Sequence, residues 1–493
     1  MIRRLVSSLL LVPAMLGAQS QQEYAARRAA LVAGLSDGAL VALGAHEPSQ
    51  DYLSFYQSPS FYYLTGFKEP GAALVVVKRG GQVVSSTMFV QPRLPSREVW
   101  TGSRLGVEGI ARLTGMSGRS ADELPKVLDS LAAAGVPMSV VGDLGESAEG
   151  ASSLIEARSP DAQVFDRLRA KHSALKVTPV NQAVERARGK KSEAELRQIR
   201  QAVDITVLAH REAMAALEPG MNEFEIQALI EYTFRRNGAD RPSFATIVGS
   251  GPNSTTLHYN ADDRFIGAND VIVMDIGASY KGYAADVTRT IPASGKFSPQ
   301  QRAVYEIVRA AQAAAERQAK VGASARLMDD SSRAVLAAGL ARLGLIESPT
   351  ATYDCAVGQE TRQCPQYRLY YMHGLGHGIG LEVHDPEQYY FTGTIAAGSA
   401  FTLEPGIYVR ERVLEEMPDS PRNREVAAKL RAAVSTYRNI GVRIEDDYIV
   451  TDKGVEWISR APREIDEIEA VMRGSYAGPA RRDPSLVEKY RGE

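Results

Sequence analysis

The sequence predicts an α/β (α+β) protein of two domains, and three observations carry this prediction. The chain has 493 residues, which is too long for one average domain. In its first part, short apolar runs alternate with helical segments, a pattern typical of α/β domains. In its last part, short apolar runs are separated by glycines, which indicates short strands following a group of longer helices.

The composition is that of an ordinary soluble globular protein, with 44% hydrophobic and 24% charged residues. The net charge of -2 lacks the Lys/Arg excess that a surface binding nucleic acid normally needs. We therefore expect small or peptidic partners and no nucleic acid.

Residues 1–18 are typical of a signal peptide. Arg3 and Arg4 precede an apolar run at 5–16, and the small residues Gly17 and Ala18 come just before Gln19. The run is short for a membrane span, and no later stretch approaches the required length. We expect an exported protein, periplasmic or extracellular, without a membrane anchor after cleavage. The alternative is an N-terminal helix of the fold.

Residues 19–182 are expected to form the N-terminal domain. Helices are predicted at 21–34 and 120–134, and strands at 39–43, 72–77, 89–90 and 139–141. The aromatic segment SFYQSPSFYYLTGF is more typical of a core or an interface than of a binding site. No group of catalytic residue types occurs in this domain.

The polar stretch AVERARGKK marks the start of a second domain, residues 183–475, which a polar tail follows at 476–493. Ser192 and Glu195 have the spacing of a capping box and begin a helix. Ser298 and Gln301 repeat this spacing, with Pro299 at the first helical position, and begin another helix that continues to about residue 318. Further helices are predicted at 222–237 and 327–343, and a charged helical insertion between two strands at 410–440.

The segment VIVMDIGASYKGYAADVTRTI, residues 271–291, predicts two strands around a turn, with one carboxylate inside each apolar run. Asp275 and Asp286 are symmetric about Tyr280 and Lys281, so a tight hairpin would make them direct cross-strand neighbours. Like charges in such a pair are destabilising. Either one aspartate is protonated or a metal ion binds both. Two solvated aspartates in surface turns are the structural alternative.

Cys355 and Cys364 are the only cysteines of the chain and lie in one polar segment. In an oxidising compartment such a nearby pair predicts a disulfide that pins the loop, whereas in the cytosol two inert thiols are the alternative. The spacing is not that of a metal-binding CxxC motif.

Four of the seven histidines lie in or beside the segments with candidate ligands: His258, His373, His377 and His384. Glycines alternate through YMHGLGHGIGLEVHD, so a helix is unfavourable there and the backbone can approach other groups closely. The spacing of His373 and His377 therefore does not indicate the HExxH helix of zinc proteases, which also needs a glutamate between the two histidines. A glycine-rich turn with two exposed histidines is the alternative.

Glu404 and Glu445 each lie inside an apolar run, where an unpaired buried carboxylate is costly. Arg443 allows a simple salt bridge to Glu445 as the structural alternative, but Glu404 has no such neighbour. With His377 and the two hairpin aspartates, these residues supply four carboxylates and one imidazole. That set suits two divalent cations, and its oxygen ligands favour Mn²⁺, Co²⁺ or Mg²⁺ over a structural Zn²⁺. A two-metal hydrolase is the resulting hypothesis, in which a bridging hydroxide attacks the substrate.

Several segments, in this order, resemble the metallopeptidase family of aminopeptidase P, prolidase and methionine aminopeptidase. They are FYYLTGFKEPGAALVVV, EVWTG, TIVGSG, LHY, DIGASYKGYAADVTRT, MHGLGHGIGLEVHD, TLEPGIYV and GVRIEDD. The resemblance covers nearly the whole chain after residue 18, and bacterial Xaa-Pro aminopeptidases look most similar. It implies a creatinase-like N-terminal α/β domain and a C-terminal catalytic domain with the pita-bread fold.

The resemblance also implies a set of metal ligands. Asp275 would bind one metal ion, Asp286 and Glu445 would bridge two, and His377 and Glu404 would complete the other site. The expected cofactor is a pair of divalent ions, with Mn²⁺ as the first choice and Co²⁺ or Zn²⁺ as alternatives.

Other side chains receive roles from the same resemblance. His384 would contact the scissile carbonyl, while His258 and His373 would relay protons or position the substrate. Arg443 would hold a ligand carboxylate in place. Tyr408 is a further candidate substrate-binding residue.

By the same resemblance, Trp100 matches a residue that, in related enzymes, closes the substrate pocket of a neighbouring subunit. A homodimer or homotetramer is therefore expected. The implied activity is that of an Xaa-Pro aminopeptidase, which removes the N-terminal residue from peptides with proline in second position. Prolidase, acting on Xaa-Pro dipeptides, and a non-catalytic pita-bread binding protein are the alternatives. Segments 353–366 and 410–440 look expanded, which leaves the preferred peptide length open.

Overall fold

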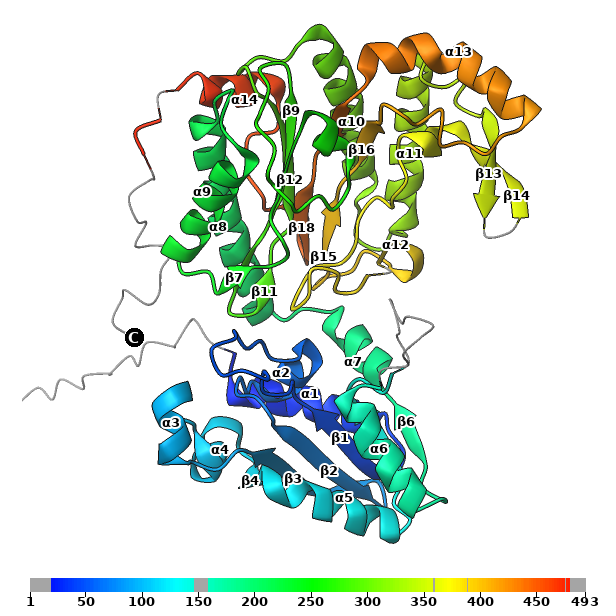
Figure 1. The fold of residues 1–493 in the computed structure, drawn as a ribbon. Coiled ribbons are helices and arrows are strands. Elements are labelled where there is room, and N and C mark those ends of the chain that lie inside the picture. Colours follow the sequence, from blue (N-terminus) through cyan, green and yellow to red (C-terminus); the bar gives the residue numbers. More distant parts are fainter. Residues whose placement is uncertain (1–18, 146–157, 358–359, 388, 475, 479–493) are drawn as a thin grey trace, which may run out of the picture. The chain divides into compact units, whose positions relative to one another are not determined.

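The computed structural model describes residues 19–145, 158–357, 360–387, 389–474 and 476–478 (Figure 1). These residues form two compact units, which divide between Val184 and Glu185. The predicted signal peptide and nearly all of the predicted polar tail lie outside the described residues. Within the described ranges, every helix is too short or too polar to cross a membrane.

The first unit is built on a six-stranded sheet with the order β4-β3-β2-β1-β5-β6. Its strands are β1 (Gly38–Leu43), β2 (Ala73–Arg79), β3 (Gln82–Val90), β4 (Ser117–Ser120), β5 (Met138–Val141) and β6 (Val177–Pro179). The first three strands pair antiparallel, and the remaining pairs are parallel. The strands predicted in this unit are thereby confirmed.

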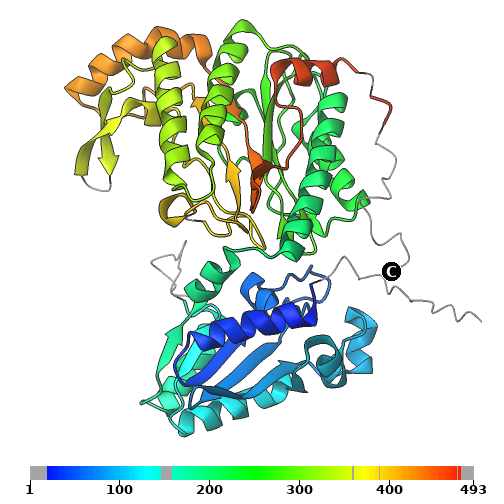
Figure 2. The same cartoon turned by 180° about the vertical axis from the view of Figure 1, so that it is seen from behind.

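Helices cover both faces of this sheet. Figures 1 and 2 show α1 (Gln21–Ala33) on one face and both α5 (Leu124–Ala133) and α6 (Pro160–Lys171) on the other. Val41 and Val75 of the sheet pack with Leu128 of α5 and Phe165 of α6 in one apolar core. The shorter helices are α2 (Pro59–Thr65), α3 (Pro95–Thr101) and α4 (Gly106–Thr114), and α7 (Asn181–Arg188) runs across the division between the units.

Two pairs of helices flank the strands of the second unit (Figure 1). They are α8 (Glu193–Ala216) with α9 (Glu223–Arg236), and α10 (Pro299–Gln318) with α11 (Arg326–Arg342). Side chains of Ser192, Asn222 and Ser298 accept backbone N–H groups of the first helical turn, so these helices begin where capping residues predict. The last helix, α14 (Ile465–Met472), packs against α8.

The strands between these helices, with the segments that connect them, carry the candidate ligands. One sheet contains β8 (Ile247–Ser250), β9 (Val271–Ile276) and β12 (Val287–Pro292), and another contains β15 (Ala400–Leu403), β18 (Asp446–Thr451) and β19 (Gly454–Trp457). β16 (Gly406–Val409) pairs with β17 (Ile440–Arg443), and β17 lies against β9 and β12. The short strands β7 (Arg241–Pro242), β10 (Ala278–Tyr280) and β11 (Tyr283–Ala284) form a third sheet.

The pairing of the central hairpin differs from the prediction, because the centre of the turn is shifted by one residue and each cross-strand partner by two. Lys281 and Gly282 form the turn with φ of 50° and 88°, the left-handed conformations that a tight two-residue hairpin requires. The centre of symmetry therefore lies between these two residues, and Asp275 pairs with Thr288 instead of Asp286. Asp286 lies just before β12. The predicted direct cross-strand pairing of the two aspartates is wrong.

The polar segment with both cysteines is a second hairpin, β13 (Thr352–Val357) and β14 (Glu360–Pro365), where only a loop was expected. A disulfide joins Cys355 to Cys364 across its two strands. The charged insertion forms α13 (Pro421–Tyr437) between β16 and β17, as predicted. Asn423 at the start of α13 donates from Nδ2 to the Asp354 carbonyl of the hairpin at 2.8 Å, so the two insertions support each other.

Candidate metal centre

One cavity of about 290 Å³ in the second unit is lined by every residue predicted to bind metal or to take part in catalysis. The predicted ligands in its wall are Asp275, Asp286, His377, Glu404 and Glu445, and the other predicted residues are His258, His373, His384 and Arg443. The remaining lining residues are Leu257, Gly374, Gly376 and Glu387. Residues as distant in sequence as Leu257 and Glu445 are thus brought together.

The ends of strands position the carboxylates. Asp275 lies on β9, and Asp286 directly precedes β12. Glu404 follows β15 and Glu445 follows Ile444 after β17, so each glutamate lies at a junction between two strands. Such junctions leave a side chain free to turn out of the sheet while its backbone remains anchored on both sides.

The distances between the side chains suit shared cations. His377 Nε2 lies 3.5 Å from Asp286 Oδ2 and 3.7 Å from Glu404 Oε1. One ligand atom each from Asp286, His377 and Glu445 lies within 4.8 Å of the others. All three side chains are buried.

The buried carboxylates of the site outnumber the cations that the chain places beside them. Oδ1 of Asp275 and Oδ1 of Asp286 are buried without a hydrogen-bond partner. Burial, and then the charges of Asp275 and other carboxylates, raises the pKa of Asp286 well above its ordinary value. Burial likewise raises the pKa of Glu404 to about 7, and burial followed by Asp286 raises that of Glu445. Divalent cations would satisfy these carboxylates in their ionised form, so the donor set fits the predicted metal ions.

The ring orientation of His377 is that of a metal ligand. Its Nδ1 lies 3.0 Å from the Gly378 carbonyl, to which it donates, so the lone pair of Nε2 points toward the carboxylates. The ring of His384 lies over that of His377 with centroids 3.9 Å apart. The side chain of His384 is 48% exposed, which leaves it accessible to a substrate.

Arg443 connects three parts of the cavity wall. Its Nη2 pairs with Asp275 Oδ2 at 2.5 Å, and its Nη1 donates to the Tyr408 hydroxyl at 2.9 Å. The same hydroxyl lies 2.8 Å from His373 Nε2, and His373 Nδ1 donates to the Gly374 carbonyl at 2.7 Å. Arg443 therefore forms its ion pair with Asp275 rather than with its sequence neighbour Glu445.

Sequence reasoning overlooked Thr288, which links two of these groups. Its hydroxyl donates to Glu445 Oε2 at 2.8 Å and accepts from Arg443 Nε at 3.2 Å. Its position on the same strand face as Asp286 was the available signal. Thr288 lies opposite Asp275, which only the register of the folded hairpin shows.

Arg188, in the stretch regarded as a polar boundary, was also overlooked. It is buried, and its Nε donates to Asp385 Oδ2 at 3.1 Å. Lys191, buried as well, donates to the Asp385 carbonyl. Both cations thus hold the residue that follows His384.

A second cavity of about 380 Å³ adjoins the first and shares His258, Asp275, Asp286 and His384 with it. Its other walls are mainly apolar: Phe244, Ala245, Ile247 and Val383, with Asn260. The candidate centre therefore lies between a polar and an apolar space.

Of the two predicted substrate-binding residues, Tyr408 is fully buried behind His373, and Trp100 belongs to the other unit. Trp100 lies on α3 and is 77% exposed. Its predicted role at a neighbouring subunit stays a prediction.

The metal-free protein is expected to lose stability as the pH rises from 5 to 7.5. Burial raises the pKa of Glu404 from 4.5 to about 7. Between these values the folded chain holds a proton that the unfolded chain has lost, so raising the pH favours unfolding. The shift corresponds to roughly 3 kcal/mol. The measurement is thermal unfolding of chelator-treated wild type and of Glu404→Gln at pH 5 and pH 7.5. The difference between their losses of stability is the contribution of Glu404.

The wild type should lose more stability than Glu404→Gln over this pH interval. Mn²⁺ added at pH 7.5 should raise the stability of the wild type more than that of the variant, because the metal binds the folded state. Equal losses in the two proteins would contradict the raised pKa of Glu404.

The chain is similar to known proteins over most of its length. Residues 197–452 match metallopeptidase family M24, and residues 24–138 match the N-terminal domain of aminopeptidase P. The chain is 34% identical to an Xaa-Pro aminopeptidase of Haemophilus influenzae, over 85% of this chain and 88% of that protein. It is 32% identical to the Escherichia coli Xaa-Pro aminopeptidase, over 92% and 98%. A human Xaa-Pro dipeptidase is 31% identical, over 89% of each.

Solved structures show the same similarity. A variant of Escherichia coli aminopeptidase P in complex with substrate superimposes with a TM-score of 0.74 at 29% identity, covering 92% of this chain and 98% of that one. Proline aminopeptidase P II from Yersinia pestis has a TM-score of 0.74 at 30% identity, covering 92% and 100%.

Proposed function

Because this chain belongs to metallopeptidase family M24 and carries the N-terminal domain of aminopeptidase P, we propose that it is an Xaa-Pro aminopeptidase. It would remove the N-terminal residue from peptides with proline in second position. The predicted family and the predicted fold class, an aminopeptidase P-type N-terminal domain followed by a metallopeptidase domain, are confirmed. The protein is therefore a metallopeptidase, a hydrolase of peptide bonds.

We assign two divalent cations, Mn²⁺ in the first place, to the ligands Asp275, Asp286, His377, Glu404 and Glu445. When bound, such ions lower the pKa of a coordinated water and stabilise negative charge on a carbonyl oxygen. The buried Oδ1 atoms of the two aspartates, which have no hydrogen-bond partner, support this assignment. The full ligand set also argues against a non-catalytic binding protein.

The chain's own groups would position the substrate and stabilise charge. Partial burial, and then the neighbouring His377 and His258, lower the pKa of His384 to about 4, so its imidazole is neutral at pH 7 and can donate one N–H to the carbonyl oxygen of the scissile bond. His373 is held by Tyr408 and by the Gly374 carbonyl, so its ring is fixed at the cavity wall. We propose that His258 and His373 orient the peptide or relay the proton that the departing proline nitrogen needs.

The scarcity of positively charged side chains in the walls of the two cavities favours an aminopeptidase over prolidase. Arg443 is the only Arg or Lys among the described residues lining them. Its guanidinium is already engaged with Asp275, Tyr408, Thr288 and the Leu257 carbonyl. An Xaa-Pro dipeptide would place its terminal carboxylate here without a free cation, and an unpaired buried charge is costly. A longer peptide carries that charge out of the cavity.

The Mn²⁺-loaded enzyme is therefore expected to hydrolyse an Xaa-Pro-Xaa tripeptide with at least about tenfold higher kcat/KM than the Xaa-Pro dipeptide, a difference of about 1.4 kcal/mol. The matched control is the same dipeptide with an amidated C-terminus, which lacks the charge but adds no residue. The amide should be the better of the two short substrates. Faster turnover of the free dipeptide than of both others would establish the prolidase alternative.

We further propose that the protein acts in an oxidising compartment outside the cytoplasm. The disulfide between Cys355 and Cys364 supports this location, because such bonds persist where thiols are not kept reduced. Two free thiols in protein isolated from its exporting host would argue against it.

A further inference from the structure

The buried carboxylate of Asp446 is next in sequence to the proposed ligand Glu445 but has no role in the proposed metal centre. In the run Glu445, Asp446 and Asp447, all three side chains are buried, but only Glu445 lines the metal cavity. Asp446 begins β18, and neighbouring side chains of a strand point to opposite faces. The Asp446 side chain pairs with Arg289 and Arg463 and does not line the cavity, so it faces the layer behind the metal centre.

We propose that Asp446, Arg289 and Gln312 form a positioning centre, which fixes the backbone beside the metal ligands and thereby sets the affinity of the site for divalent cations. This inference depends on the proposed metal centre. None of the three residues lines either cavity, so each would act through other groups.

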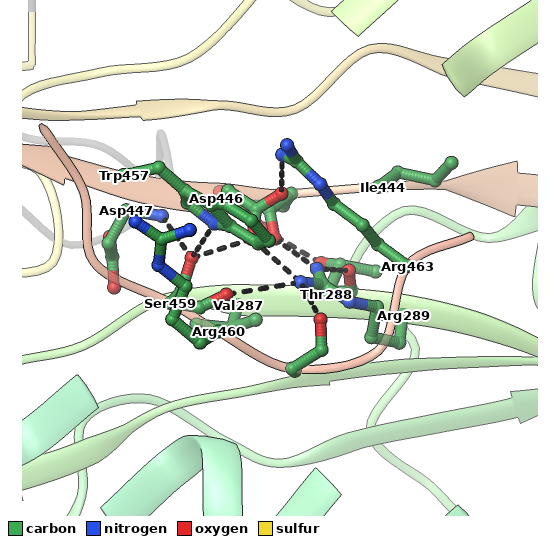
Figure 3. A network of polar contacts seen from close by, with 12 residues as sticks. Val287, Thr288, Arg289, Ile444, Asp446, Asp447, Trp457, Ser459, Arg460 and Arg463 are labelled. Atoms are coloured by element: carbon green, nitrogen blue, oxygen red, sulfur yellow. Dashed lines mark hydrogen bonds and ion pairs between the residues drawn. The ribbon is translucent and has the colours of Figure 1, made fainter. Parts of the chain in front are cut away.

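Asp446 is the anion at the middle of this centre. Figure 3 shows Arg289, Arg463, Trp457 and Ser459 converging on its carboxylate. Oδ1 accepts from Arg289 Nη2 at 2.7 Å, from Trp457 Nε1 at 2.8 Å and from the Ser459 hydroxyl at 2.6 Å. Oδ2 accepts from Arg463 Nη1 and from Gln312 Nε2, each at 2.9 Å. A carboxylate with five donors is satisfied in its ionised form and orients each of them.

Arg289 connects Asp446 to the backbone on either side of the ligand Glu445. Its guanidinium is fully buried, and Nη1 donates to the Glu445 carbonyl at 2.7 Å and to the Thr288 carbonyl at 2.9 Å. The Glu445 N–H donates to the same Thr288 carbonyl at 3.0 Å, and the Thr288 hydroxyl holds the Glu445 carboxylate. The peptide groups on both sides of the Glu445 Cα are therefore fixed.

Gln312 of α10 extends the anchoring to Glu404. Its Nε2 lies 3.3 Å from the Leu403 carbonyl and 3.4 Å from the Ile444 carbonyl, as well as 2.9 Å from Asp446 Oδ2. These carbonyls belong to the residues directly before Glu404 and Glu445. One amide thus connects the two junctions that present the glutamate ligands.

The arrangement has a physical reason. The carboxylates of the metal site lie close together around His377, and like charges in their ionised form repel one another, so their backbones would separate if nothing held them. A rigid frame keeps the ligands close before metal binds, and less free energy is then lost in ordering them. Groups that orient metal ligands typically change metal affinity or activity by roughly 10- to 100-fold when mutated.

The test is the binding of Mn²⁺ alone to metal-free Gln312→Met, measured by calorimetric titration at pH 7.5. Methionine keeps the length of the side chain and removes the N–H donors, and the dissociation constant is expected to rise by roughly tenfold or more. Trp457→Phe keeps an aromatic ring and removes one N–H donated to Asp446, and should weaken binding in the same direction by a smaller factor. It also serves if Gln312→Met does not fold.

Gln301→Met is the matched control. Gln301 lies near the start of the same helix, is buried, and donates to the Asn269 carbonyl at 2.8 Å, and neither residue lines a cavity. It should lose stability while binding Mn²⁺ like the wild type. Wild-type affinity in both Gln312→Met and Trp457→Phe would overturn the positioning centre, as would an equal loss of affinity in the control. Failure of the wild type to bind Mn²⁺ would instead refute the metal centre itself.

Discussion

Asp286→Asn is expected to lower the hydrolysis of an Xaa-Pro-Xaa tripeptide by at least roughly 10³-fold, because metal ions supply several kcal/mol of transition-state stabilisation. Asp286 is 5% exposed and lies within reach of His377 and Glu445, so its carboxylate would be shared between two cations. Asparagine has the same shape but no charge. Its amide is a weak ligand, and the charge balance of the centre would be lost.

The variant should remain folded, since neutralising Asp286 removes repulsion from the metal-free site. Circular dichroism and metal analysis, beside steady-state kinetics, separate loss of metal from loss of fold. Asp262→Asn is the matched control: Asp262 is also fully buried, accepts from the Val248 N–H at 2.9 Å and lines neither cavity. It should keep near-normal activity. Near-normal turnover of Asp286→Asn would refute the shared-ligand assignment.

His384→Ala is expected to reduce kcat by roughly 10² or more while metal content stays unchanged, as for the loss of one donor to a developing oxyanion. The ring borders both cavities and is not among the predicted metal ligands. Burial, and then the nearby His377, keeps its pKa low at about 4, so it acts as a neutral donor at pH 7.

His384→Gln retains an N–H donor near the same place and should recover part of the lost kcat. His46→Ala in the first unit, where His46 pairs with Asp161, is the neutral control. If the loss of activity in His384→Ala were matched by loss of metal, His384 would be a group that supports the ligands instead of one that contacts the substrate.

Much of the second unit followed from local signals in the sequence. The capping boxes at Ser192 and Ser298 predicted where α8 and α10 begin, because a cap depends only on residues three positions apart. The alternating glycines around His377 correctly excluded a helix. Charged residues inside apolar runs identified Glu404 and Glu445, since burial makes an unpaired carboxylate costly wherever the chain places it.

The hairpin shows where local reasoning ends. Its strands and turn were predicted, but Lys281 takes a left-handed conformation that is uncommon outside glycine, and this moved the centre of the turn by one residue. The consequence is large: Thr288 instead of Asp286 faces Asp275, and Thr288 becomes the link between Arg443 and Glu445.

The sequence by itself determined which kinds of elements form and which chemical groups are available for metal binding, because both depend on nearest neighbours, periodicity and the cost of burying charge. Only the tertiary structure decided the partners: Arg443 pairs with Asp275, 168 positions away, and Asp446 turns from the metal cavity toward Arg289 and Gln312. These contacts join strands and helices that are distant in sequence. Their geometry depends on register and packing, which no local pattern of residues encodes.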